Sequence, residues 1–113
     1  FRIKIHKGKK MIIILCNTNS HENAELIART LVTEELCACV NIIPKIQSIY
    51  KWQGKIENDT EFLMLIKTKN ELFAQVKNRI LELHPYKVPE VISFDITNGN
   101  KEYLDWICQN TRK

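Results

Sequence analysis

The chain has 113 residues, of which 44% are hydrophobic and 27% are charged, with three glycines, three prolines and four cysteines. This balance is typical of one globular domain and excludes collagen-like, disordered and disulfide-scaffold proteins. The apolar runs are far shorter than the ~18 residues that a membrane-spanning helix needs, so we expect no membrane association. A chain of this length buries enough surface to fold without a metal or cofactor.

The net charge of +4 is concentrated at the N-terminal end. Residues 1–10 hold five of the 17 basic residues, and the twelve that remain face 13 acidic residues in residues 11–113. Proteins that bind nucleic acid carry basic clusters on a folded face, so we expect no nucleic-acid partner. We interpret residues 1–10 as a basic tail or, because Phe1, Ile3 and Ile5 alternate with polar residues, as an extra edge strand. Residues 11–113 are then a single domain.

The four cysteines are expected to be reduced thiols. No secretory signal is readable after the basic residues of the N-terminal end, and the cysteines show no C-x-x-C pairing. Thiols stay reduced in the cytoplasm, so we predict a cytoplasmic protein.

The first predicted elements are a buried strand and a helix. Residues 11–16 form a continuous apolar run, and Ser20 or Asn19 can cap a helix that runs to about Leu36. The expected buried stripe of this helix is Ala24, Ile27, Ala28, Leu31 and Val32.

A long hairpin is predicted next. Residues 37–53 favour a strand that is bent or bulged near Pro44, because proline is tolerated in strands only at edges and bulges. A turn at residues 53–55 leads back into a third strand, whose apolar part spans residues 61–69.

A second helix, a short strand and a last helix complete the pattern. Asn70 is the expected cap of a helix with the stripe Leu72, Phe73, Val76, Ile80 and Leu83. The prolines in residues 84–89 exclude helix there, and residues 90–96 alternate as a fourth strand. Asn100 is expected to cap a helix that buries Tyr103, Leu104, Ile107 and Cys108.

The order β-α-β-β-α-β, followed by a helix, predicts an α+β fold of the ferredoxin-like split βαβ type. Its helices cover one face of an antiparallel sheet, so each strand should alternate apolar residues, which face the helices, with polar residues on the open face. Residues 11–16 and 61–69 are instead apolar on both parities. We therefore expect self-association to cover the open face.

A few side chains are candidates for chemistry. Cys16 ends a buried strand, where a thiol can be reached, and His84 follows the second helix, where it serves either as a C-terminal cap or as a ligand. Cys37-x-Cys39 is a weak signal for a soft metal. We interpret the carboxylates of residues 57, 59 and 61 as a solvated turn.

Three further side chains stand on the predicted hairpin and its return strand. Tyr50 and Trp52 share one face of the arm, where aromatic rings serve protein contacts at least as readily as ligand stacking. Lys67 leaves an apolar strand and either pairs with an acid or extends to solvent.

The sequence does not favour an enzyme or an RNA-binding domain. It contains no G-x-S-x-G, P-loop or H-E-x-x-H motif and no nucleophile with a recognisable base. The strand at residues 61–69 lacks the aromatic pattern with which RNA-binding domains of this strand order stack bases. No arginine stands in a strand-to-helix loop to hold a phosphate, as a phosphatase of this fold would need.

Five ordered segments resemble the CutA divalent-cation tolerance family. They are residues 39–44, 48–57, 61–68, 84–90 and 99–106. The resemblance implies a ferredoxin-like subunit in a tight homotrimer, similar to PII signalling proteins, with hairpin arms that pair between subunits. It also implies copper binding and a role in metal tolerance or homeostasis, and it leaves room for an unknown protein partner.

The resemblance also implies site residues. Bacterial members are credited with a copper site made by a strand-end cysteine and two successive histidines before Pro-Tyr. Cys16 and His84 match two of these ligands, whereas Leu83 stands at the other histidine position. Cys39 and Glu90 are weaker metal candidates.

The remaining candidates, expected at a subunit interface or ligand cleft, are Tyr50, Trp52, Lys67 and Tyr86. The alternative function is a small-ligand-binding or enzymatic trimer of the same fold, with its sites in the clefts between subunits.

Overall fold

The computed structural model describes residue 6 and residues 8–113. The elements in chain order are β1 (Met11–Thr18), α1 (His21–Thr33), β2 (Cys39–Trp52), β3 (Lys55–Lys69), the 3-10 turn η1 (Asn70–Leu72), α2 (Phe73–Leu83), β4 (Ile92–Asp95) and α3 (Lys101–Gln109). The predicted order of strands and helices is confirmed. The alternation of Phe1, Ile3 and Ile5 lies outside the described residues, so the choice between tail and edge strand stays a prediction.

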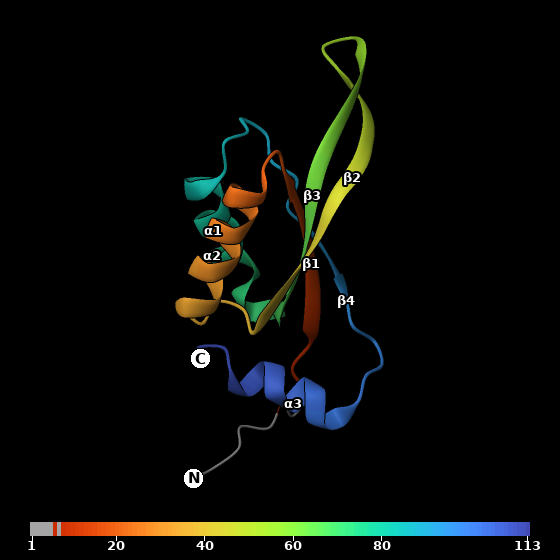
Figure 1. Cartoon of the computed structure of the whole chain (residues 1–113). Helices are drawn as coiled ribbons and strands as arrows, with labels where there is room; N and C mark the ends of the chain where they lie inside the picture. Colours follow the sequence, from red (N-terminus) through yellow and green to blue (C-terminus); the bar gives the residue numbers. More distant parts are fainter. Residues whose placement is uncertain (1–5, 7) are drawn as a thin grey trace.

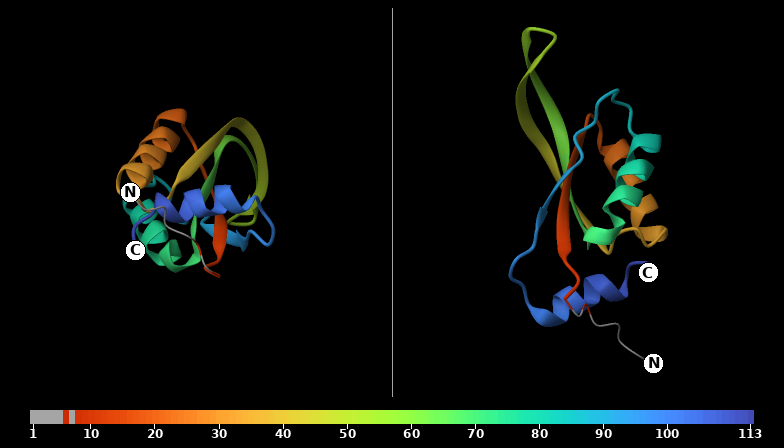
Figure 2. Two further views of the ribbon diagram at one scale, coloured as in Figure 1. Left: turned by 90° about the horizontal axis from the view of Figure 1, so that it is seen from below. Right: turned by 180° about the vertical axis from the view of Figure 1, so that it is seen from behind.

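The four strands form one antiparallel sheet in the order β2-β3-β1-β4. Helices α1 and α2 lie side by side on one face of the sheet, and α3 lies across its lower end (Figure 1). The β2-β3 hairpin extends well beyond the body, as the view from behind also shows (Figure 2). The predicted α+β fold of the ferredoxin-like type with a long hairpin is confirmed.

Helix α1 begins as predicted and ends early. The Asn23 backbone N–H donates to Ser20 Oγ at 3.1 Å, which satisfies one of the unpaired donors of the first turn. The helix ends at Thr33 rather than near Leu36, because Glu35 adopts φ 59° and turns the chain back. Val32, which we expected to be buried, is 43% exposed, since it lies at the margin of the apolar stripe.

The bend and the turn of the hairpin lie where the sequence predicts them. The register between β2 and β3 shifts between Ile43 and Ile46, on either side of Pro44, and Lys45 takes a left-handed φ of 56°. At the tip Gln53 and Gly54 have φ of 51° and 81°, a conformation that glycine adopts without strain.

The last two helices correct two of our predictions. Asn70 opens the turn η1 instead of capping α2, whose N-cap position is Leu72, with no side-chain hydrogen bond to the helix. Asn100 does cap α3, because its side chain accepts a hydrogen bond from the Glu102 backbone N–H. Tyr103 is 41% exposed rather than buried, because its ring stacks on the exposed Trp106 and contacts the Lys67 side chain instead of entering the core.

The sheet face opposite α1 and α2 carries apolar side chains that none of the helices in the described part of the chain covers. Ile13 and Leu15 of β1 stand opposite Phe94 and Ile92 of β4 in the register. Phe94 is 50% exposed and Ile92 is 56% exposed. The described chain therefore leaves apolar surface open where the sequence predicts it. None of the helices in the described residues is long and apolar enough to cross a membrane.

Candidate functional site

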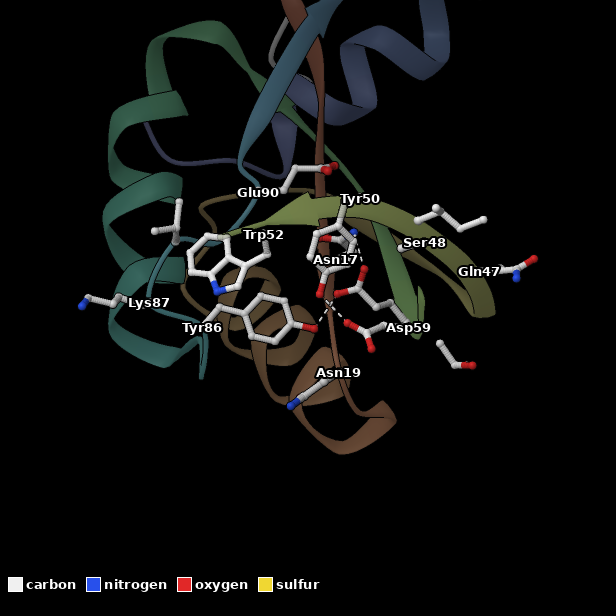
Figure 3. Close-up of a pocket in the computed structure, with 14 residues that line it drawn as sticks. Asn17, Asn19, Gln47, Ser48, Tyr50, Trp52, Asp59, Tyr86, Lys87 and Glu90 are labelled. Atoms are coloured by element: carbon white, nitrogen blue, oxygen red, sulfur yellow. Dashed lines mark hydrogen bonds between the residues drawn. The ribbon is translucent and has the colours of Figure 1, made fainter. Parts of the chain in front are cut away.

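A cavity of about 900 Å³ lies along the hairpin, between the arm of β2 and β3 on one side and the end of β1 with the segment after α2 on the other (Figure 3). The end of β1, the two hairpin strands and residues 86–90 supply its walls. The polar and aromatic side chains that line it include Asn17, Tyr50, Trp52, Asp59, Glu61, Tyr86, Lys87 and Glu90.

Glu61 is a buried carboxylate in the cavity wall. Its side chain is only 4% exposed, and it accepts hydrogen bonds from Asn17 Nδ2 at 3.0 Å and from the Tyr86 hydroxyl. The interpretation of this carboxylate as part of a solvated turn is therefore wrong. Strand parity did not predict this burial, because Leu63 and Leu65, which share the parity of Glu61, are only half-buried, whereas the fully buried Met64 and Ile66 have the opposite parity.

His84 is fixed by hydrogen bonds on both ring nitrogens. Nδ1 accepts a bond from the Tyr86 backbone N–H at 3.1 Å, so Nε2 carries the hydrogen and donates it to the carbonyl oxygen of Asn17 at 2.7 Å. With the two bonds to Glu61, these contacts close a ring through His84, Asn17, Glu61 and Tyr86. His84 also holds the C-cap position of α2, as its cap interpretation predicts.

Cys16 lies next to this ring, inside β1 rather than at its end as predicted, because the strand continues to Thr18. Its side chain is buried, and Sγ lies 3.9 Å from the same Asn17 carbonyl oxygen that His84 contacts. Burial, assisted by the charges of Glu90 and Glu61, raises the pKa of the Cys16 thiol to about 12, so it is protonated at neutral pH. The structure thus brings Cys16 and His84 together. Within the described residues, no group of three or more His, Cys, Asp and Glu side chains is arranged to hold a metal ion.

Of the remaining candidates, Glu90 lies in the cavity, whereas Cys39 and Lys67 lie elsewhere on the sheet. Cys39 stands opposite Lys67 in the register, and its Sγ lies 3.9 Å from Asn41 Oδ1, so it does not join Cys16. The Lys67 amine donates to Asn41 Oδ1 at 2.6 Å and lies 5.7 Å from the Tyr103 ring centroid, away from the cavity. Glu90 does line the cavity, where partial burial and the nearby Glu61 raise its pKa.

The three aromatic candidates meet in the cavity. Tyr50 and Trp52 enter from β2, and Tyr86 enters from the segment after α2 (Figure 3). The Tyr50 hydroxyl donates to Asp59, and this bond is the main reason that the pKa of Tyr50 rises to about 12. Burial and the bond to Glu61 raise the pKa of Tyr86 as well. The hydroxyl groups of both tyrosines therefore stay protonated, and each holds one carboxylate in place.

Comparison with known proteins identifies the family. Residues 12–110 match the family model described as "CutA1 divalent ion tolerance protein". The chain is 48% identical over 99 residues to the Divalent-cation tolerance protein CutA of Thermus thermophilus, covering 88% of this chain and 96% of that protein. It is 49% identical over 88 residues to the human Protein CutA, of which it spans 49%.

A solved structure agrees with the fold. The divalent cation tolerance protein (Cut A1) from Thermus thermophilus superimposes with a TM-score of 0.88 at 47% sequence identity, over 90% of this chain and 99% of that chain. The sequence match over nearly the whole domain and the shared fold lead to one conclusion: the chain belongs to the CutA divalent-cation tolerance protein family.

Proposed function

We propose that the protein is a homotrimer that binds copper or a related metal ion and acts in metal homeostasis or in PII-like signalling. The observation that carries the proposal is the convergence of Cys16 and His84 on one carbonyl oxygen, in a chain that belongs to a divalent-cation tolerance family. On this proposal the protein binds rather than catalyses, and it works in the cytoplasm with reduced cysteines.

The donor chemistry of the two residues fits copper. Thiolate and imidazole are both good copper ligands, and Cu(II) leads the divalent affinity series. Binding has a cost in this chain, because both His84 nitrogens already make hydrogen bonds and the buried Cys16 thiol must lose its proton. Leu83 supplies no third donor. We therefore expect a weak site that prefers copper to zinc.

The trimer is supported by the surface of the subunit. The open sheet face exposes Phe94 and Ile92, and the long hairpin leaves Tyr50 and Trp52 partly exposed. Surfaces of this kind on a single domain are typical of contacts with other chains. A second copy is the economical partner, because each copy brings the same open face.

Copper binding tests the metal site. We would titrate the parent protein with Cu(I), Cu(II) and Zn(II), and then the variants Cys16→Ser and His84→Ala. Both variants should lose copper affinity by about tenfold or more, as expected when a metal site loses a ligand. Cys39→Ser and His21→Ala remove the same side chains elsewhere and should bind as the parent does.

The pH dependence adds a second readout. Binding should be about tenfold stronger for each unit of rising pH, because the Cys16 thiol, whose pKa is raised, releases one proton as the metal binds. Measurements at pH 6 and 7.5 check this slope. Equal copper binding by the parent, Cys16→Ser and His84→Ala would show that the metal site lies elsewhere.

A second candidate function has its own observation. The cavity along the hairpin is large enough for a small molecule and combines polar with aromatic walls. A small-ligand-binding protein of this fold would use such a cavity, either within one subunit or in the cleft that it forms with a neighbour. Binding of a small molecule to the parent protein that is weakened by substitutions in the cavity wall would support it.

A further inference from the structure

The cavity carries an excess of negative charge. Asp59, Glu61 and Glu90 contribute carboxylates to its walls, and Lys87 is the one basic residue among those that line it. Figure 3 shows the Lys87 side chain extending away from the carboxylates rather than among them. Partial burial, together with the nearby carboxylate of Glu61, raises the pKa of Glu90, as expected where two carboxylates line one cavity.

The buried carboxylate is held in place before any ligand arrives. Glu61 accepts one bond from Asn17 and one from Tyr86, and the bonds of His84 to both of these residues complete the ring. An ionised carboxylate offers about four acceptor positions, so Glu61 keeps capacity for a further donor. Preorganised, partly desolvated acceptors of this kind bind a cation with little loss of conformational freedom.

The remaining walls are apolar and aromatic. The rings of Tyr50, Trp52 and Tyr86 line the same hollow, and Ile49 and Val88 add aliphatic surface. Aromatic rings attract organic cations through their faces as well as burying apolar groups. A bare metal ion would not use these walls, and no arrangement of three His, Cys, Asp and Glu ligands occurs in the described residues. Anions such as nucleotides would meet the carboxylates.

From this combination we infer that the cavity binds a small organic cation, a protonated amine joined to an apolar or aromatic body. The inference rests on the second candidate function, that of a small-ligand-binding protein. The ammonium group lies at Asp59, Glu61 and Glu90, and the apolar body lies against the aromatic rings. The copper proposal neither requires this site nor excludes it.

Three probes of one shape test the charge. Phenethylammonium, 2-phenylethanol and 3-phenylpropionate are cationic, neutral and anionic forms of a similar molecule, and each is titrated into the assembled protein by calorimetry. We expect the amine to bind at least about tenfold more tightly than the alcohol, because hydrogen bonds between charged groups exceed neutral ones by about that factor. The propionate should not bind.

Variants of the wall locate the binding. Asp59→Asn and Glu90→Gln keep the shapes of their side chains and should each weaken amine binding by about fivefold or more, while the alcohol binds as before. Glu57→Gln removes the same charge from β3 at a residue that does not line the cavity, and it should change binding by less than about twofold. Glu61→Gln is less informative alone, because it also alters the buried ring.

The outcomes separate the two levels of the proposal. Equal binding of amine and alcohol would overturn the cation assignment and leave a small-ligand site in place. No binding of any probe would overturn both. Tight binding of the amine that Asp59→Asn and Glu90→Gln leave unchanged would overturn the assignment to this cavity.

Discussion

Asn17 links the two candidate metal ligands to the cavity. Its carbonyl oxygen accepts the His84 bond and lies near the Cys16 thiol, while its side chain donates to Glu61 in the cavity wall. A metal ion that takes His84 must break one bond of this ring, and a ligand at Glu61 acts on another. The two proposed sites therefore share a residue, so binding at one can change affinity at the other.

The sequence predicted some members of this site and missed others for physical reasons. Cys16 and His84 were found because each was predicted to stand at the end of a regular element; His84 does cap α2, whereas β1 continues past Cys16 to Thr18 and buries the thiol. Glu61 and Asn17 were missed as partners, because their contact joins positions that do not pair directly across the strands, where Asn17 stands opposite Leu63. The burial of Glu61 depends on the segment that carries Tyr86. The local sequence does not predict that this segment packs against the carboxylate.

Asn17→Ala tests how much the ring stabilises the fold. It removes the donor to Glu61 and leaves the carbonyl that His84 contacts. The loss leaves a buried carboxylate with one partner fewer, so the free energy of unfolding should fall by about 1 to 3 kcal/mol. Urea denaturation measures this fall. Asn19→Ala, at an exposed residue of the same cavity, should be nearly neutral, and equal effects of the two substitutions would contradict the role of the ring.

Among the elements, the hairpin shows how far local patterns reach. Alternation in β2, the proline bend and the glycine turn were all readable from the sequence, because each depends on neighbouring residues. The start of α2 was not, since Asn70 was a reasonable cap and the chain formed a 3-10 turn there instead. The exposure of Tyr103 was not predicted either, because it depends on the contacts of its ring with Trp106 and Lys67.

Trp52→Ala tests the hairpin as a contact between subunits. Trp52 keeps 45% of its surface exposed although it lines the cavity, so we expect this exposed part to contact a neighbouring copy, and its loss should cost about 2 kcal/mol or more of assembly free energy. Sedimentation over a range of protein concentrations measures the shift. Ile56→Ala, at an exposed apolar residue of the same arm, is the control and should leave assembly unchanged. Unaltered assembly of Trp52→Ala would assign the ring to the ligand cavity alone.

At the scale of the whole molecule, the described part of the subunit has a helical layer on only one face of its sheet. Helices α1 and α2 cover one sheet face (Figure 1). On the other face, apolar residues of β1 stand opposite apolar residues of β4, and no helix of the described residues covers them. The sequence predicted this from strands that are apolar on both parities. What it could not predict is the geometry of the cover, because no residue pattern within one chain specifies how copies meet.

Phe94→Asp tests whether copies of the chain supply that cover. A carboxylate on the apolar open face would be buried without a partner on assembly, so the variant should sediment as a folded monomer at concentrations where the parent is a trimer. Its thermal midpoint should also fall and lose its dependence on protein concentration, because assembly no longer stabilises the native state by mass action. Leu26→Asp is the matched control, since Leu26 has the same 50% exposure as Phe94 but lies on α1, in the helical layer. It should sediment as the parent does. A parent that is monomeric at micromolar concentration, or a Phe94→Asp variant that still forms trimers, would show that the open face is not the surface through which copies associate.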